Sequence, residues 1–182
     1  MAEEAFIVSN QVPSSAALPI AHTVLRIGIV ANWVYGAAIL TLLLVMPHEQ
    51  WIMKAFKLSP SPDAERVIMG LRAIAVTGLV SIPLNHIVLR RLLSMVETIR
   101  AGDPFIAPNA RRLHAIAWSL LALQLLSMVV GAIARVISTP AHPIKMDAGF
   151  SVSGWLAVLL TFVLASVFAQ ATRMREDLAG TV

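Results

Sequence analysis

The feature that most constrains this chain is a set of four long apolar stretches without Asp, Glu, Lys or Arg. They hold 20, 17, 22 and 25 residues, at 27–46, 73–89, 113–134 and 148–172. A bilayer core about 30 Å thick is crossed by ~20 helical residues, so three stretches are long enough as they stand. The second becomes long enough when it is extended back through Arg72 to Val67. A chain with this pattern folds in lipid, where helices satisfy their own backbone groups.

Composition supports the same class of protein. Only 13% of the 182 residues are charged, and the mean hydropathy is +0.79, whereas soluble domains hold about 25% charged residues. These values exclude a soluble globular domain and a disordered chain. The chain has no cysteine, which excludes a disulfide framework, a thiolate metal site and a cysteine nucleophile.

Proline-containing segments separate the apolar stretches and end the helices, because proline lacks a backbone N–H and restricts the residue before it. The fold class predicted is an all-α integral membrane bundle of four transmembrane helices, forming a single domain over residues 1–182. The helices are expected near 22–46, 66–89, 112–137 and 151–172, with tails at 1–20 and 173–182.

The distribution of basic residues predicts the orientation. The side that holds both termini and the loop after the second helix carries eight Lys and Arg residues, and the other side carries six. Five of the eight are arginines of the 90–112 loop. Since basic residues are enriched in cytoplasmic loops, both termini are predicted to lie in the cytoplasm.

The second helix is predicted to continue as an amphipathic segment. From Val88 to Arg100, apolar residues recur at helical spacing and charged residues fill the other face. This extension leaves the membrane or lies along its inner surface. Two roles stay open for it: a helix end anchored by arginines, and a helix that docks a partner.

Two blocks of residues resemble a known family. The first is Gly102-Asp103-Pro104-Phe105 followed by Asn109, Arg112-Leu113 and Ile116-Ala117-Trp118, and the second is Val167-Phe168 followed by Met174-Arg175-Glu176-Asp177 and Thr181-Val182. Both are similar to blocks of the DUF2975 family of bacterial four-helix membrane proteins. Where many members have a glycine after the C-terminal Phe, this chain has Gln170-Ala171.

The resemblance implies a bacterial inner-membrane protein, multi-pass, with no established biochemical activity. Members are often encoded beside small helix-turn-helix regulators, which implies a protein that senses or controls such a regulator. The resemblance supplies no catalytic residue.

The residues themselves also predict a protein without catalysis. The apolar stretches contain no carboxylate, and the chain has no Ser/Thr nucleophile signature and no glycine-rich phosphate loop. The basic cluster abuts the membrane and lacks interleaved aromatic residues, so direct nucleic-acid contact is not expected. A protein partner is expected instead, and its candidate binding residues are Glu97, Arg100, Asp103, Asn109, Arg112, Arg175 and Glu176. Asn109 is further expected to cap the third helix.

Two alternatives compete with this function. One is an accessory subunit of a larger membrane complex, and homo-oligomerisation is open in either case. The other is a haem- or small-ligand-binding protein, because His86 and His114 should both lie toward the cytoplasmic ends of their helices and facing imidazoles can ligate a haem. No cofactor is otherwise predicted.

Four polar residues fall near the middle of the predicted helices: Asn32, Thr77, Gln124 and Thr161. Polar groups at that depth need partners, which lipid does not provide. They predict either a small polar site at the midplane or hydrogen bonds between helices. Small residues at Gly28, Gly36, Gly70 and Gly78 are suited to close helix packing or to dimerisation.

Overall fold

A computed structural model describes residues 17–45, 62–138 and 147–179. The four helices of these residues are α1 (Ala17–Val45), α3 (Pro62–Arg100), α4 (Ala107–Ile137) and α5 (Val152–Ala179), and no strand occurs among them. Each helix is long and apolar enough to cross a membrane, with a mean hydropathy between 1.9 and 2.2 over its most apolar window. The prediction of a four-helix, multi-pass membrane protein is confirmed.

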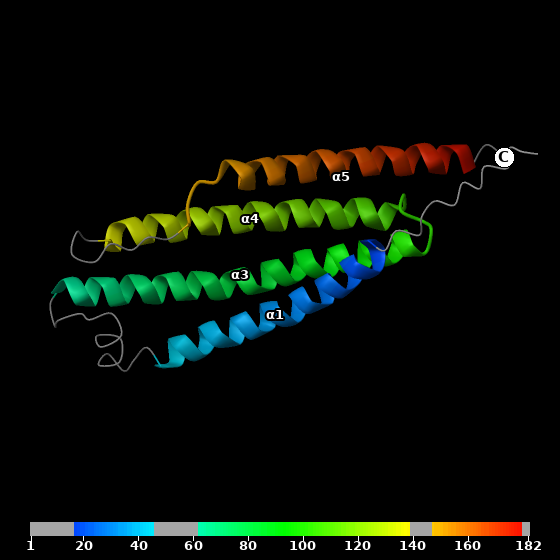
Figure 1. The fold of residues 1–182 in the computed structure, drawn as a ribbon. Helices are drawn as coiled ribbons and strands as arrows, with labels where there is room; N and C mark the ends of the chain where they lie inside the picture. The colour runs from blue at the N-terminus through cyan, green and yellow to red at the C-terminus, as the bar shows by residue number, and fades with distance from the viewer. Residues whose placement is uncertain (1–16, 46–61, 139–146, 180–182) are drawn as a thin grey trace, which may run out of the picture.

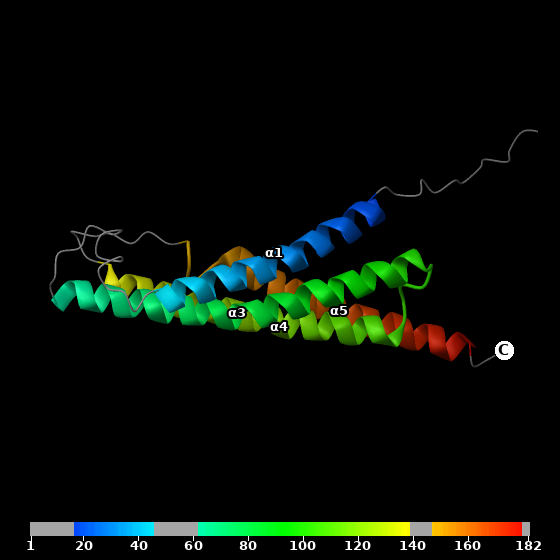
Figure 2. The same ribbon diagram turned by 90° about the horizontal axis from the view of Figure 1, so that it is seen from below.

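The helices pack in chain order. The extensive contacts are those of α1 with α3, α3 with α4, and α4 with α5, and Figure 1 shows the four lying side by side in that order. The N-terminal half of α1 rises away from the other three helices in Figure 2. The two outer helices, α1 and α5, therefore bury less of their surface than the two inner ones.

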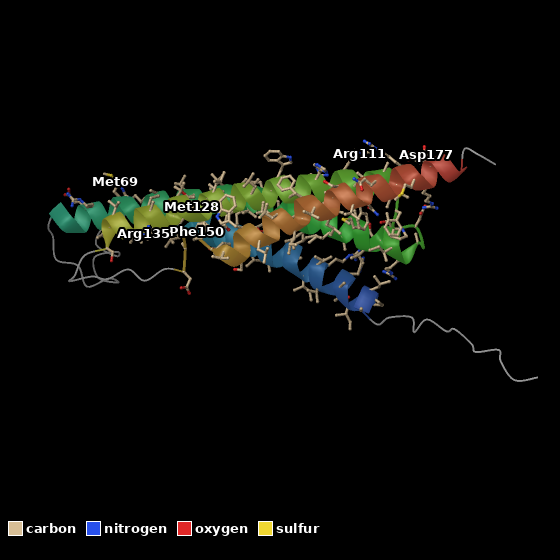
Figure 3. All side chains as sticks on the ribbon, turned by 90° about the horizontal axis from the view of Figure 1, so that it is seen from above. Met69, Arg111, Met128, Arg135, Phe150 and Asp177 are labelled. Carbon is tan, nitrogen blue, oxygen red and sulfur yellow. The ribbon has the colours of Figure 1, made fainter. Side chains whose placement is uncertain are left out.

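Both ends of the described chain lie at one end of this bundle. The start of α1, the turn between α3 and α4, and the end of α5 all lie toward this end, as the colours of Figure 1 show. We call it the terminal end. Arg111 and Asp177 lie toward it in Figure 3, whereas Met69 and Arg135 lie toward the opposite end.

Three helices begin earlier than the apolar stretches indicate, α1 at Ala17, α3 at Pro62 and α4 at Ala107. Pro62 is the first residue of α3, and Pro108 lies in the first turn of α4. Proline is tolerated at these positions because the first N–H groups of a helix have no intrahelical acceptor. At its other end, α3 continues without interruption through Pro83 to Arg100.

The largest buried cluster lies near the terminal end and joins three helices. Met95 of α3, Leu113 and Ile116 of α4, and Ala165 of α5 form its centre. Among residues 152–177 of α5, the buried ones are Val158, Ala165 and Thr172, and their spacing of seven places them on one stripe that faces α4. A second cluster of Ile39, Ala75 and Ile82 joins α1 to α3.

Glycines allow the close approach of α1 to α3. A Cβ at Gly28 would lie 3.4 Å from Leu89, and one at Gly36 would lie 3.2 Å from Ile82. Gly78 faces Ile39 across the same interface, and Gly70 packs against Ile137 of α4. The packing role predicted for these glycines is confirmed.

Candidate functional site at the terminal end

A tight turn joins α3 to α4. The backbone N–H of Asp103 donates to Thr98 O (3.1 Å) and that of Gly102 donates to Ile99 O (3.0 Å), which is the hydrogen-bond pattern of a Schellman cap. Gly102 has a φ of 84°, a conformation that costs a side chain but not glycine. The turn predicted from Gly102 and Pro104 is thus present, and it reverses the chain between the two inner helices.

Asn109 holds this turn from the inside. Its side chain is fully buried, and its Nδ2 donates to Thr98 Oγ1 and to Pro104 O, each at 2.8 Å. Its Oδ1 accepts a hydrogen bond from Arg112 Nη1 (2.7 Å). Both amide hydrogens and the amide oxygen are therefore used within the protein.

The predicted capping role of Asn109 is wrong. The residue at the N-cap of α4 is Ile106, and no side chain caps the helix. Asn109 lies inside the first turn of α4, where its amide group is directed back to the end of α3. The reason is that α4 begins at Ala107, five residues before the predicted start, so Asn109 is already helical.

Arg112 ties the same turn to the body of α3. Besides its bond to Asn109, its Nη1 donates to Ser94 O at 3.4 Å, and the residue is half-buried. Two of the candidate partner-binding residues, Asn109 and Arg112, thus form an internal network. Asn109 has no surface to offer to a partner.

A second group of candidate residues surrounds an open cavity. The cavity has a volume of about 330 Å³ and lies between the turn and the last turns of α5. Its lining residues are Asp103, Phe105, Ile106, Ala107, Pro108, Thr172, Arg175 and Glu176.

An ion pair across this cavity joins distant parts of the chain. Arg175 of α5 donates to the Asp103 carboxylate and, through the same Nη1, to Phe105 O (3.3 Å). Phe105 also packs on Phe168 of α5, with the ring centroids 5.2 Å apart. The end of α5 is therefore connected to the turn by one ion pair and one aromatic contact. The side chains of Asp103, Arg175 and Phe105 remain partly exposed in these contacts.

The remaining two candidates lie on the last turn of α3. Glu97 is exposed, and its Oε1 is 3.9 Å from Nε2 of His22 on α1, while Arg100 is the exposed last residue of the helix. The structure thus brings Asp103, Arg175 and Glu176 together at the cavity. Glu97 and Arg100 do not line it.

The polar residues predicted near the midplane do not converge on one site. Asn32 of α1 donates to Ile82 O of α3 at 3.1 Å, which is a hydrogen bond between helices. Thr77 and Thr161 each donate to the carbonyl four residues earlier in their own helix. Gln124 is buried against Gly154 of α5, and its Nε2 has no hydrogen-bond partner in the part of the chain that is described.

The two histidines considered as haem ligands contact opposite outer helices. The His86 ring meets Trp33 of α1 edge-on, with centroids 5.4 Å apart. The His114 ring meets Phe162 of α5, with centroids 6.1 Å apart. The packing of α1 and α5 on opposite sides of the inner helices thus directs these imidazoles to different neighbours.

Sequence reasoning missed two parts of this site. Thr98 accepts from Asn109 and donates to Met95 O, and its position on the polar face of the 88–100 segment was its available signal. Phe105 forms the aromatic wall of the cavity, and the sequence gives no signal for its contact with Phe168. That contact depends on how α5 returns to the turn.

Comparison with known proteins places the chain in a family. The family model described as "Protein of unknown function (DUF2975)" matches residues 9–182, nearly the whole chain. The chain belongs to the DUF2975 family. No curated protein and no solved structure matches it.

The first of the two blocks that resemble the DUF2975 family, which begins at Gly102, contains the turn. Gly102 and Pro104 form the turn, and Asn109 and Arg112 hold it from within. The second block contains Arg175 and Glu176, which line the cavity. In this DUF2975 protein, the two blocks that lie far apart in sequence meet at the terminal end.

Proposed function

We propose that this DUF2975 protein binds a protein partner at the terminal end, without catalysing a reaction. The observation that carries the proposal is the cavity bounded by Asp103, Arg175 and Glu176. It lies between the α3–α4 turn and the last turns of α5, is open to the surroundings, and combines apolar walls with charged groups at its rim. Interfaces with protein partners commonly have this composition, with an apolar centre and a polar rim.

The partner proposed is a small helix-turn-helix regulator, which the protein senses or controls from the bacterial inner membrane. The gene arrangement implied by the family resemblance supports this partner. The orientation proposed has both termini in the cytoplasm, which would expose the terminal end to a cytoplasmic regulator. Its support is the excess of basic residues at this end, eight against six.

The amphipathic role of the end of α3 is part of the same proposal. Met95 contributes to the core, whereas Glu97 and Arg100 are exposed. We assign residues 90–100 to the region where the helix leaves the membrane. Its exposed charged side chains would then extend the surface that surrounds the cavity.

A chemical cross-linking pull-down tests the proposal. The tagged full-length protein is cross-linked in native membranes, and the co-purifying chains are identified and quantified by mass spectrometry. Charge reversal by R175E or R100E is expected to reduce capture of the same partner several-fold while the protein still inserts. The matched control is R173E, which reverses an exposed arginine on the same turn of α5 that does not line the cavity.

A double variant separates binding from the structural role of the ion pair. In D103R/R175E the opposite charges are retained but exchanged, so the fastening of α5 to the turn can form again. If the partner recognises the individual charges at positions 103 and 175, capture of the partner should stay low in the double variant. Unchanged capture in both R100E and R175E would refute docking at this surface and leave the turn as a hinge and membrane anchor.

The second candidate function is that of an accessory subunit in a larger membrane complex. The observation that favours it is the row arrangement, which leaves much of α1 and α5 without contacts from other helices. In that case the captured chain is itself a membrane protein, and R175E leaves its capture unchanged.

A further inference from the structure

The face of α1 directed away from α3 contains a hollow. Gly28, Asn32 and Gly36 contact α3, and the opposite face has a hollow of about 410 Å³. Its lining residues are Arg26, Ile27, Val30, Ala31 and Val34. All five are exposed, and the small side chain of Ala31 lies among three larger ones. The extensive helix contacts of α1 are with α3 alone, so this face, which is turned away from α3, has no closely packed neighbour among the described helices.

The order of the lining residues follows the order of groups in a phospholipid. Arg26 immediately precedes the uncharged stretch 27–46, whose 20 residues span about 30 Å as a helix. Because this length matches the hydrocarbon core, Arg26 lies at headgroup depth. The apolar lining from Ile27 to Val34 extends about 12 Å from Arg26 into the leaflet of the terminal end.

We propose that this hollow binds an anionic phospholipid of that leaflet. The Arg26 guanidinium pairs with the phosphate, since guanidinium groups match phosphate oxygens in geometry and charge. One acyl chain lies beside Ala31, between the side chains of Ile27, Val30 and Val34. The site is independent of the cavity at the α3–α4 turn, with which it shares no lining residue.

Charge decides between a lipid and a second copy of the chain on this face. A parallel dimer through the same face would place two Arg26 side chains against each other at the membrane surface. Like charges in contact are unfavourable, and more so where water is scarce. An anionic lipid neutralises the same arginine instead.

Native mass spectrometry of the full-length protein tests this site. The protein is purified in detergent and titrated separately with phosphatidylglycerol and with phosphatidylethanolamine. The test variants are R26Q, which removes the cation, and A31F with the smaller A31L, which fill the hollow. The matched controls are R111Q, an exposed arginine of the same end, and A38F, the same added bulk at an exposed position on α1 outside the hollow.

The expected result is preferential retention of phosphatidylglycerol by the wild type. Retention of phosphatidylglycerol should fall about fivefold in R26Q. This factor corresponds to about 1 kcal/mol, the contribution of one arginine near an anionic lipid surface. A31F and A31L should also lower retention, with the larger effect in A31F, while R111Q and A38F retain the lipid as the wild type does. Thermal unfolding in the same micelles verifies that each variant is folded.

Three results would overturn the proposal. Equal losses in R26Q and R111Q would mean that only the general charge of the end attracts the lipid. Retention unaffected by A31F and A31L would mean that no acyl chain occupies the hollow. A wild-type dimer that A31F dissociates would identify a second copy as the occupant.

Discussion

Replacement of Asn109 by alanine tests whether one buried side chain holds the turn between α3 and α4. Asn109 makes two hydrogen bonds to neutral acceptors and one to the charged Arg112. Neutral hydrogen bonds contribute ~0.5–1.5 kcal/mol each, and those with a charged group ~1.5–3 kcal/mol. Because Arg112 is only half-buried and regains some hydration, N109A is expected to lower the free energy of unfolding by about 3 kcal/mol.

Two further variants test the hydrogen bonds of Asn109. N109D keeps an acceptor for Arg112, but it turns a buried carboxylate oxygen toward Pro104 O, which is also an acceptor, so its loss should be at least as large as that of N109A. T98V removes one acceptor of the Asn109 amide and should cost about 1 kcal/mol. The exposed Gln170 of α5 provides the control, and Q170A is expected to change stability by less than ~0.5 kcal/mol.

The assay is equilibrium unfolding in mixed micelles, followed by circular dichroism. N109A and N109D are predicted to lose the most stability and T98V less, with Q170A close to the wild type. An N109A variant as stable as Q170A would refute the assignment of Asn109 as the residue that holds the turn.

Three further changes probe packing between the helices. G154A would place a Cβ against the amide end of the Gln124 side chain. Because this flexible side chain can shift, the substitution should destabilise the protein by only about 1 kcal/mol, and thermal unfolding of G154A/Q124A should show that much of the loss is recovered. Q124L should leave the stability unchanged or raise it in the same assay, because it removes a buried Nε2 that has no hydrogen-bond partner among the described residues. A loss of stability above ~1 kcal/mol would instead mean that this Nε2 donates to an acceptor. N32L should lower the free energy of unfolding by about 0.6 kcal/mol, the average contribution of a hydrogen bond between membrane helices. A much larger loss would mean that Asn32 has a role beyond its hydrogen bond to Ile82 O.

The sequence predicted the number and type of elements well, because their signal is local. A stretch of ~20 uncharged residues has one structural solution in lipid, and Gly102 followed by Pro104 marks the end of a helix. The start of α3 was placed too late because the segment 59–63, which contains Pro62, was read as a break, and the start of α4 was placed after Pro108, near the beginning of the uncharged stretch. Both prolines lie in first turns, where the missing N–H costs nothing.

The candidate site was predicted only in part, because its geometry is not local. The contact between Asp103 and Arg175 joins residues 72 positions apart, and no spacing rule foretells it. Asn109 was recognised as part of the turn, but its role depended on whether α4 begins before or after it. Chemically similar residues thus separate into an internal network and an exposed cavity rim once the helices are in place.

Site-specific photo-cross-linking from the cavity tests the central claim most directly. In one variant a photoreactive phenylalanine analogue replaces Phe105 on the cavity wall, where 44% of the residue is exposed. In the control variant it replaces Phe150, which precedes α5 toward the opposite end of the bundle and is 67% exposed. After irradiation in native membranes, position 105 is predicted to form an adduct with one defined protein, and position 150 is predicted not to form it. Equal adducts from the two positions, or none from position 105, would contradict partner binding at the terminal end.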